Sequence, residues 1–305
     1  MLRMTPSLKA CLLCIPWYTC SSMENVVNKM FFGYYPLPVT ISMFQMATIV
    51  TILYPSSKVW NITCNVRIFD TEALKYFLPL ALMRAVSSIM THASINLLAV
   101  SYANTIKTTM PLVTLVLSRK IFKVKYSVWE FASVLCIMFG VSLATVTEIS
   151  FDMNGVCFTI FAMLGQICEI FISKLAFINL KIEPINLLFN VHLIAFFITQ
   201  TVWVLFELNF IMYNVRFTLQ RDLIYFIAML LASAVASLVS HASKALLNSI
   251  LTPLGYSMAK SAKSIFVIMT SLLLLKNPVT FSNLTGTILA LFGLGLYDRM
   301  KLKRE

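Results

Sequence analysis

The sequence places four lysines inside long apolar segments, where a positive charge is costly. Lys107, Lys260 and Lys263 lie well within such segments, and Lys244 lies near the end of another. At the centre of a membrane helix, a lysine costs about 2.5–3.5 kcal/mol on insertion scales. A lysine in this position either faces a polar cavity or extends its ammonium group to the membrane surface. We expect Lys107, Lys260 and Lys263 to face a cavity and Lys244 to reach the surface.

Two or more ammonium groups in one cavity would bind an anionic solute such as a phosphate, because lysine binds phosphate as a point charge. Glu24 and Glu169, the main acids inside apolar segments, would pair with a lysine or serve in proton coupling. Polar side chains near the lysines are candidate hydrogen-bonding partners of the solute, although packing between helices explains single hydroxyl groups equally well. These side chains are Ser88, Thr91 and His92 before Lys107, Ser240 and His241 before Lys244, and Ser264 after Lys263.

The sequence carries no pattern typical of an enzyme or a metal protein. It has no paired carboxylates in the apolar segments, and it lacks the HExxH, GxSxG and Gly-rich phosphate-loop motifs. The seven cysteines are odd in number and lie mostly inside apolar segments, so neither a disulfide framework nor a zinc site is expected. We therefore expect no enzymatic activity, no cofactor and no metal.

The elements that position these residues are apolar segments long enough to cross a bilayer. The chain has 305 residues, of which 59% are hydrophobic and only 12% charged, whereas a soluble domain carries about 25% charged residues. A membrane-spanning helix needs about 20 mostly apolar residues. Apolar segments fall at 8–32, 37–55, 74–97, 99–119, 126–148, 153–177, 185–207, 222–247, 250–275 and 279–298. The sequence therefore predicts an all-α membrane protein with ten transmembrane helices, the first of which is a retained span and not a cleaved signal peptide.

The basic residues predict how these spans are oriented. With both termini in the cytosol, most lysines and arginines between the spans fall on the cytosolic side, as the positive-inside rule requires. The net charge of +12 then reflects basic cytosolic loops beside the lipid bilayer, and no nucleic-acid partner is expected.

A weak internal repeat relates two of the lysine-bearing segments. Without gaps, residues 101–120 align with residues 257–276, which places Lys107 over Lys263. The two copies are five spans apart, so they would cross the membrane in opposite directions. Inverted repeats are typical of secondary transporters, whose solute site lies near the midplane between the repeats.

This repeat divides one transporter domain, residues 1–305, into two halves. We expect a first five-helix repeat at 8–148, a second at 153–298 and a basic cytosolic tail at 299–305.

Three segments resemble the triose-phosphate translocator family, most closely its animal branch in solute carrier family 35, subgroup E. They are VSYANTIKTTMPLVTLVLSR at 100–119, LATVTEISFDMNG at 143–155 and the segment 251–286, which contains AKSAKS. The resemblance implies the drug/metabolite transporter fold, with ten spans in two inverted five-helix repeats. It also implies that Lys107 and Lys263 bind the phosphate of the solute with help from Thr91.

Three positions depart from the pattern of the plastid members of that family. Ser264, Ser88 and Ser240 stand where those members have an arginine, a histidine and a tyrosine. An arginine binds phosphate through a planar two-pronged fork, which a serine lacks. Lys260 restores the positive charge about one turn away, but not the fork.

The function implied is an alternating-access antiporter that exchanges a sugar phosphate or other organic phosphate for inorganic phosphate. A nucleotide-sugar antiporter with a nucleoside monophosphate as counter-solute is an alternative, and so is a non-transporting membrane protein that keeps the fold. The C-terminal KLKRE resembles a KxKxx retrieval signal read by coat proteins, or it is an ordinary basic stop after the last span. The first interpretation predicts the endoplasmic reticulum or Golgi membrane.

Overall fold

The computed structural model describes residues 6–59, 70–123, 126–145, 152–214 and 220–274, together with parts of 282–297. The regular elements within these residues are all helices. They are α1 (Pro6–Tyr34), α2 (Pro38–Val59), α3 (Thr71–Leu97), α4 (Val100–Lys107), α5 (Met110–Ile121), α6 (Val128–Thr145), α7 (Met153–Leu180), α8 (Pro184–Phe206), α9 (Leu208–Asn214), α10 (Gln220–Ile250) and α11 (Pro253–Leu274). The predicted basic tail at 299–305 lies outside the described residues.

Five of the described helices are long and apolar enough to cross a membrane. They are α2, over Pro38–Pro55, with α3, α7, α8 and, over Leu223–Ile250, α10. Large apolar side chains point away from the protein on the outer helices, including Phe139 on α6, Phe161 on α7 and Ile224 on α10. Lipid solvates such side chains, so the exposed apolar surface and the long helices together define a membrane protein.

The predicted span at 99–119 is divided in two. α4 ends at Lys107, and α5 begins at Met110 with Pro111 in its first turn. Pro111 has no backbone N–H and its ring crowds the preceding turn, so the helix restarts at this point. Between the two helices, Thr109 donates its backbone N–H and its hydroxyl to the carbonyl of Ile106, at 3.2 and 2.9 Å. The ammonium group of Lys107 therefore belongs to the C-terminal turn of α4, where a positive charge is favoured.

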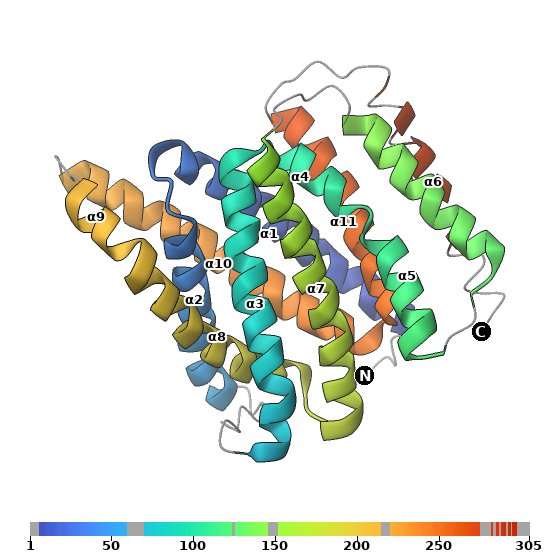
Figure 1. The fold of residues 1–305 in the computed structure, drawn as a ribbon, viewed down its shortest axis with the longest axis horizontal. Coiled ribbons are helices and arrows are strands. Elements are labelled where there is room, and N and C mark those ends of the chain that lie inside the picture. Colours follow the sequence, from blue (N-terminus) through green and yellow to red (C-terminus); the bar gives the residue numbers. More distant parts are fainter. Residues whose placement is uncertain are drawn as a thin grey trace.

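The core of the molecule is a bundle in which distant helices pack side by side. The most extensive contacts join α3 with α7 and α1 with α10, followed by those that join α2 with α8. In Figure 1, α6 lies at one edge of the bundle beside α5 and the last helical segments, while α8 and α9 lie at the opposite edge. This arrangement places α1, α3, α7, α10 and α11 around the centre.

Two lysines hold the junctions that lead from α3 to α4 and from α10 to α11. Lys29 of α1 and Lys174 of α7 each donate to three backbone carbonyls. The shortest contacts are 2.8 Å to Ile95 and 2.9 Å to Leu98 for Lys29, and 3.0 Å to Ser249 and 2.9 Å to Leu251 for Lys174. The last carbonyls of a helix have no partner within the helix, and cations near them are favourable. Both junctions are thus stabilised by the same kind of contact.

Gly140 of α6 makes the closest helix crossing among the described glycines. A Cβ atom at Gly140 would lie 2.5 Å from the backbone nitrogen of Ala290, and one at Gly293 would lie 2.9 Å from the backbone nitrogen of Ile137. The two backbones therefore meet without intervening side chains, as in membrane helix pairs built on small residues.

We expect Gly140→Ala to lower the stability of the detergent-purified protein, because the methyl group forces the two helices apart at a cost of about 1–3 kcal/mol. A Cβ atom at Gly295 would meet nothing within 4 Å, so Gly295→Ala is the matched control. Thermal unfolding followed by fluorescence should show a lower Tm for Gly140→Ala only. Equal Tm values for the two variants would contradict the close crossing.

Candidate solute-binding site

A cavity in the middle of the bundle is lined by seven charged side chains from the described helices. Its walls come from α1, α3, α4, α7, α8, α10 and α11. The charged residues that line it are Glu24, Arg84, Lys107, Glu169, Lys244, Lys260 and Lys263. The cavity thus brings together ionisable groups that are far apart in the sequence.

Lys107, Lys260 and Lys263 form a group on two helices, called here the α4/α11 lysines. The ammonium of Lys263 donates to the hydroxyl of Ser21 at 2.9 Å and lies 5.9 Å from the ring centre of Trp17. Within the described part of the chain, none of the three lysines forms an ion pair. Their positive charges are held by neutral partners, which leaves them available to an anion.

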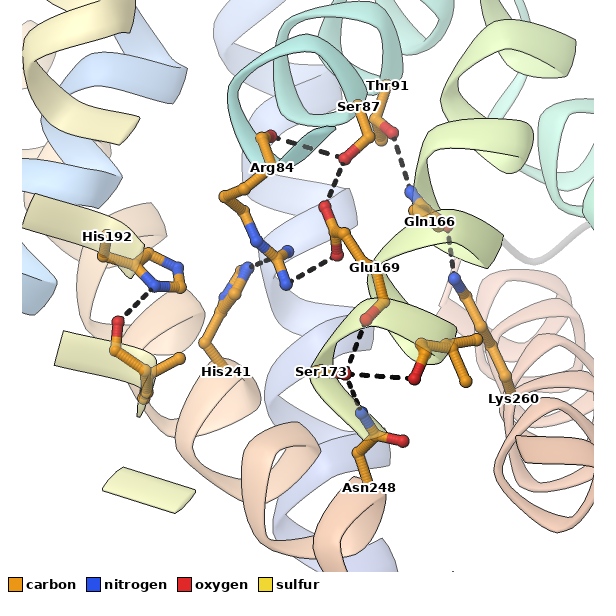
Figure 2. Close-up of polar contacts among 12 residues, drawn as sticks. Arg84, Ser87, Thr91, Gln166, Glu169, Ser173, His192, His241, Asn248 and Lys260 are labelled. Atoms are coloured by element: carbon orange, nitrogen blue, oxygen red, sulfur yellow. Dashed lines mark hydrogen bonds and ion pairs between the residues drawn. The ribbon is translucent and has the colours of Figure 1, made fainter. Parts of the chain in front are cut away.

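Gln166 of α7 connects two of these lysines. Its amide oxygen accepts a hydrogen bond from Lys260, and its amide nitrogen donates to the hydroxyl of Thr91 at 3.2 Å. The ammonium of Lys107 lies 3.5 Å from the same hydroxyl. Figure 2 shows Gln166 between Thr91 and Lys260. One short chain of polar contacts therefore orients the α4 and α11 sides of the cavity relative to each other.

Arg84 and Glu169 form an ion pair on the neighbouring wall. The guanidinium of Arg84 lies 2.7 Å from one carboxylate oxygen of Glu169, and the hydroxyl of Ser87 donates to the other at 2.7 Å. Beside this pair, a guanidinium nitrogen of Arg84 lies 3.2 Å from Nε2 of His241 (Figure 2). The charges of Arg84 and Glu169 therefore largely cancel.

His241 is neutral on geometric grounds. Nδ1 of His241 lies 2.8 Å from the carbonyl of Ser237, which only accepts hydrogen bonds, so Nδ1 carries the proton. Nε2 faces a guanidinium nitrogen of Arg84, which only donates, so Nε2 accepts. Nδ1 of His192 donates to the carbonyl of Leu188 at 2.8 Å, and the rings of His192 and His241 pack edge to face with centres 5.2 Å apart.

Lys244 lines the cavity, whereas the sequence predicted that it extends to the membrane surface. It lies six residues before the end of α10, which is about 9 Å along a helix. Among the described residues, it forms no ion pair and no hydrogen bond.

Of the eight predicted site residues, five line the cavity and three do not. Five of them line the cavity, namely Lys107, Lys263, Thr91, Lys260 and Ser264. Three do not belong to the lining. His92 is buried with Nδ1 2.6 Å from the hydroxyl of Ser42, Ser240 is buried with no partner for its hydroxyl, and Ser88 is half-buried on α3.

Two polar residues that make contacts in the cavity, Arg84 and Gln166, were not predicted from the sequence. Arg84 lies in the middle of the apolar segment 74–97, and this position is itself a signal, since an arginine inside a span almost always faces the protein interior. Gln166 carried no such signal, because an uncharged amide in an apolar helix is compatible with any position.

An all-helical membrane protein with a cationic cavity between its helices has the architecture of a transporter for anions. The chain belongs to the Triose-phosphate Transporter family, which it matches over residues 8–298. The resemblance inferred from the lysine-bearing segments is thereby confirmed. Members of this family are transporters and not enzymes.

Several curated proteins are similar over nearly the whole chain. The triose phosphate/phosphate translocator of non-green plastids from Brassica oleracea var. botrytis is 27% identical over 98% of this chain and 74% of its own length. Phosphoenolpyruvate/phosphate translocator 1 of Arabidopsis thaliana is 26% identical over 98% of this chain and 73% of its own length. The xylulose 5-phosphate/phosphate translocator of Arabidopsis thaliana is 25% identical over 95% of this chain and 69% of its own length.

A solved crystal structure supports the fold. It superimposes with a TM-score of 0.70, over 97% of this chain and 98% of its own, at 9% sequence identity. This similarity concerns the fold alone.

Breaking the Arg84–Glu169 pair is expected to destabilise the protein. Glu169→Gln leaves the guanidinium without a counter-charge in a buried position, and such losses cost about 3–5 kcal/mol. Arg84→Met leaves the carboxylate unpaired and should have a similar effect, whereas the double variant should lose less stability than the two single variants combined. A double-mutant cycle of Tm values measures this coupling, and additive losses would show that the pair contributes none.

Proposed function

We propose that this protein is an antiporter that exchanges an organic phosphate for inorganic phosphate by alternating access. The observation that carries the proposal is the convergence of the α4/α11 lysines on one cavity, where none of them forms an ion pair with an acid among the described residues. Relatives that are named as exchangers of triose phosphate, phosphoenolpyruvate or xylulose 5-phosphate for phosphate support it. In this proposal the phosphate of the solute is the missing counter-charge.

We also propose that the chain forms ten spans in two inverted five-helix repeats. The contacts of α1 with α10 and of α7 with α3 fit a pseudo-two-fold relation that exchanges the two halves. The two lysines that hold the helix junctions, Lys29 and Lys174, occupy matching places in the two halves, and Glu24 and Glu169 each precede them by five residues. Such repeats rock against each other around a site near the midplane.

The helix starts suggest which lysines correspond. Lys107 is the eighth residue of α4, counted from Val100, and Lys260 is the eighth residue of α11, counted from Pro253. The alignment of the two segments by residue identity paired Lys107 with Lys263 instead. In the proposed site, Lys107 and Lys260 are the symmetry-related pair, and Lys263 adds a third point charge where Ser264 offers only a hydroxyl.

Exchange follows from the cost of an empty site. Without a solute, the cavity holds several ammonium groups that lack counter-charges, and moving them through a closed conformation is expensive in a low-dielectric interior. A bound phosphate neutralises them, so only the loaded carrier changes sides. The same reasoning makes net uniport slow.

Two other functions lead to different expectations. A nucleotide-sugar antiporter would exchange a nucleoside monophosphate, and a non-transporting protein would exchange nothing. The three lysines argue against the second, because a scaffold gains nothing from unpaired charges inside the membrane.

Purified protein in liposomes loaded with inorganic phosphate is expected to take up labelled phosphate. Lys107→Met and Lys263→Met should each lower the rate at least about tenfold, since each removes a charge-assisted contact of about 1.5–3 kcal/mol with the anion. Lys120→Met, which changes an exposed lysine in the last turn of α5, should behave like the wild type.

Each outcome of this experiment has a distinct meaning. Uptake that requires internal nucleoside monophosphate and not phosphate would favour the nucleotide-sugar alternative. Uptake no higher than in protein-free liposomes would favour the non-transporting alternative. The variant Lys260→Asn tests whether Lys260 supplies the positive charge of the arginine that Ser264 replaces. Unchanged exchange in this variant would refute that role.

We propose the endoplasmic reticulum or Golgi membrane as the location, with both termini cytosolic, on the basis of the C-terminal KLKRE. With a fluorescent tag at the N-terminus, Lys301→Ala combined with Lys303→Ala should release the protein from these membranes to later compartments, because both lysines are needed for recognition by the coat. An unchanged distribution, or a location of the wild type in another organelle, would contradict the proposal.

A further inference from the structure

Glu207 is a buried acid that the solute site does not use. It lies where α8 ends and α9 begins, and only 7% of it is exposed. It lies outside the lining of the central cavity, and within the described part of the chain it forms no ion pair. A buried carboxylate without a counter-charge is costly unless hydrogen-bond donors surround it.

The donors to Glu207 come from the start of α2. The backbone N–H groups of Val39 and Thr40 donate to its two carboxylate oxygens at 2.8 and 2.6 Å. The hydroxyl of Thr40 donates to the second oxygen at 2.7 Å and accepts the indole N–H of Trp203 at 2.9 Å. The first N–H groups of a helix have no partner within the helix, and a negative charge is favourable beside them. Glu207 thus caps α2 from another helix.

This cap joins the two proposed repeats at one end of the bundle, called here the far end, where α1 ends and α2 begins. The helix α2 belongs to the first repeat and α8 to the second. Toward the other end of the same helix pair, the rings of Tyr54 and Phe189 are stacked with centres 6.0 Å apart. A ring contact tolerates sliding, whereas three hydrogen bonds to one carboxylate require a defined geometry.

A hydrophobic cluster at the far end borders the cavity. Ile95 and Val100 belong to this cluster and also line the cavity. On its other side, Phe31 and Tyr35 of α1 pack against Phe226 of α10, with ring centres 5.4 and 5.0 Å apart. The cluster therefore joins the two proposed repeats beside the far end of the cavity.

The cap is connected to this cluster through both helices that it joins. Ile41 of the cluster follows Thr40 on α2, and Ile211 of α9 packs against the cluster. Ile211 also donates its backbone N–H to the carbonyl of Glu207 at 2.9 Å. While the carboxylate is bound to α2, the starts of α2 and α9 stay together and the cluster remains closed between them.

We propose that Glu207 is a latch that keeps the cavity closed at the far end, and that its carboxylate must leave Val39 and Thr40 before a solute passes there. This inference rests on the proposed function, because a carrier with two access states must open each end in turn. A small set of directed hydrogen bonds suits a latch, since switching between packed arrangements is discrete and not gradual.

Labelling of the cavity from one side tests the latch. The reporter is Asn104→Cys, a buried position on α4 that lines the cavity. A membrane-impermeant maleimide is added to sealed liposomes, and only molecules whose N-terminal tag is protected from external protease are analysed. Their far end faces outward, because α1 crosses from the N-terminal side to the far end. Mass spectrometry of the peptide that contains residue 104 gives the labelling rate.

We expect Glu207→Gln to raise this rate roughly tenfold, because the amide loses the charge and turns its NH₂ group toward a backbone donor. Glu183→Gln, which changes an exposed acid at the opposite end of α8, is the matched control and should label like the parent. Trp203→Phe removes only the indole donor and should raise the rate by a smaller factor. Thermal unfolding shows which variants are folded. Unchanged labelling in Trp203→Phe and in a folded Glu207→Gln, or an equal rise in Glu183→Gln, would overturn the latch.

A cross-link separates this inference from the proposed function. In the double variant Thr40→Cys and Glu207→Cys, a short cleavable bismaleimide joins α2 to α8. Phosphate exchange should stop after cross-linking and resume after cleavage, and exchange that continues at the full rate would refute the latch. If the wild type exchanges no phosphate but Glu207→Gln still opens the far end to the maleimide, the latch stands and the antiporter fails.

Discussion

The cost of placing charge inside a membrane governs the organisation of this protein. Seven acidic or strongly basic side chains line one cavity, and each needs a polar partner or an opposite charge there. Arg84 and Glu169 solve the problem by pairing with each other, and the hydroxyl of Ser87 and the imidazole of His241 complete the contacts. The lysines solve it only in part, through neutral groups on neighbouring helices. The difference between the two solutions marks the region where a solute anion is needed.

The same constraint applies to the backbone. A helix that ends within the bundle leaves carbonyl groups without partners, and the bilayer supplies no water to satisfy them. At the end of α3 and at the end of α10, a lysine from another helix takes this role. Because each lysine contacts several carbonyls at once, it also defines where the next helix begins. The starts of α4 and α11, and with them the positions of Lys107 and Lys260, depend on Lys29 and Lys174.

Hydropathy predicted the all-helical membrane character of the protein but less of the site. Apolar segments at the right spacing predict the helices, because the bilayer demands about 20 apolar residues regardless of their order. The division between α4 and α5 was not predicted, although Pro111, which lies in the first turn of α5, is present in the sequence. The sequence did not predict that Lys244 faces the cavity. Its position near the end of the apolar segment 222–247 suggested a surface position, but α10 continues to Ile250. In the proposed repeat, the helix starts pair Lys107 with Lys260, whereas residue identity pairs Lys107 with Lys263.

Replacing an arginine by point charges changes how a site selects its solute. A guanidinium fixes a phosphate in one plane through two parallel hydrogen bonds, whereas ammonium groups attract it from several directions with little demand on orientation. In the proposed site, Lys107, Lys260 and Lys263 would therefore recognise the charge of a phosphate more than its orientation. Selectivity must then come from contacts with the remainder of the solute.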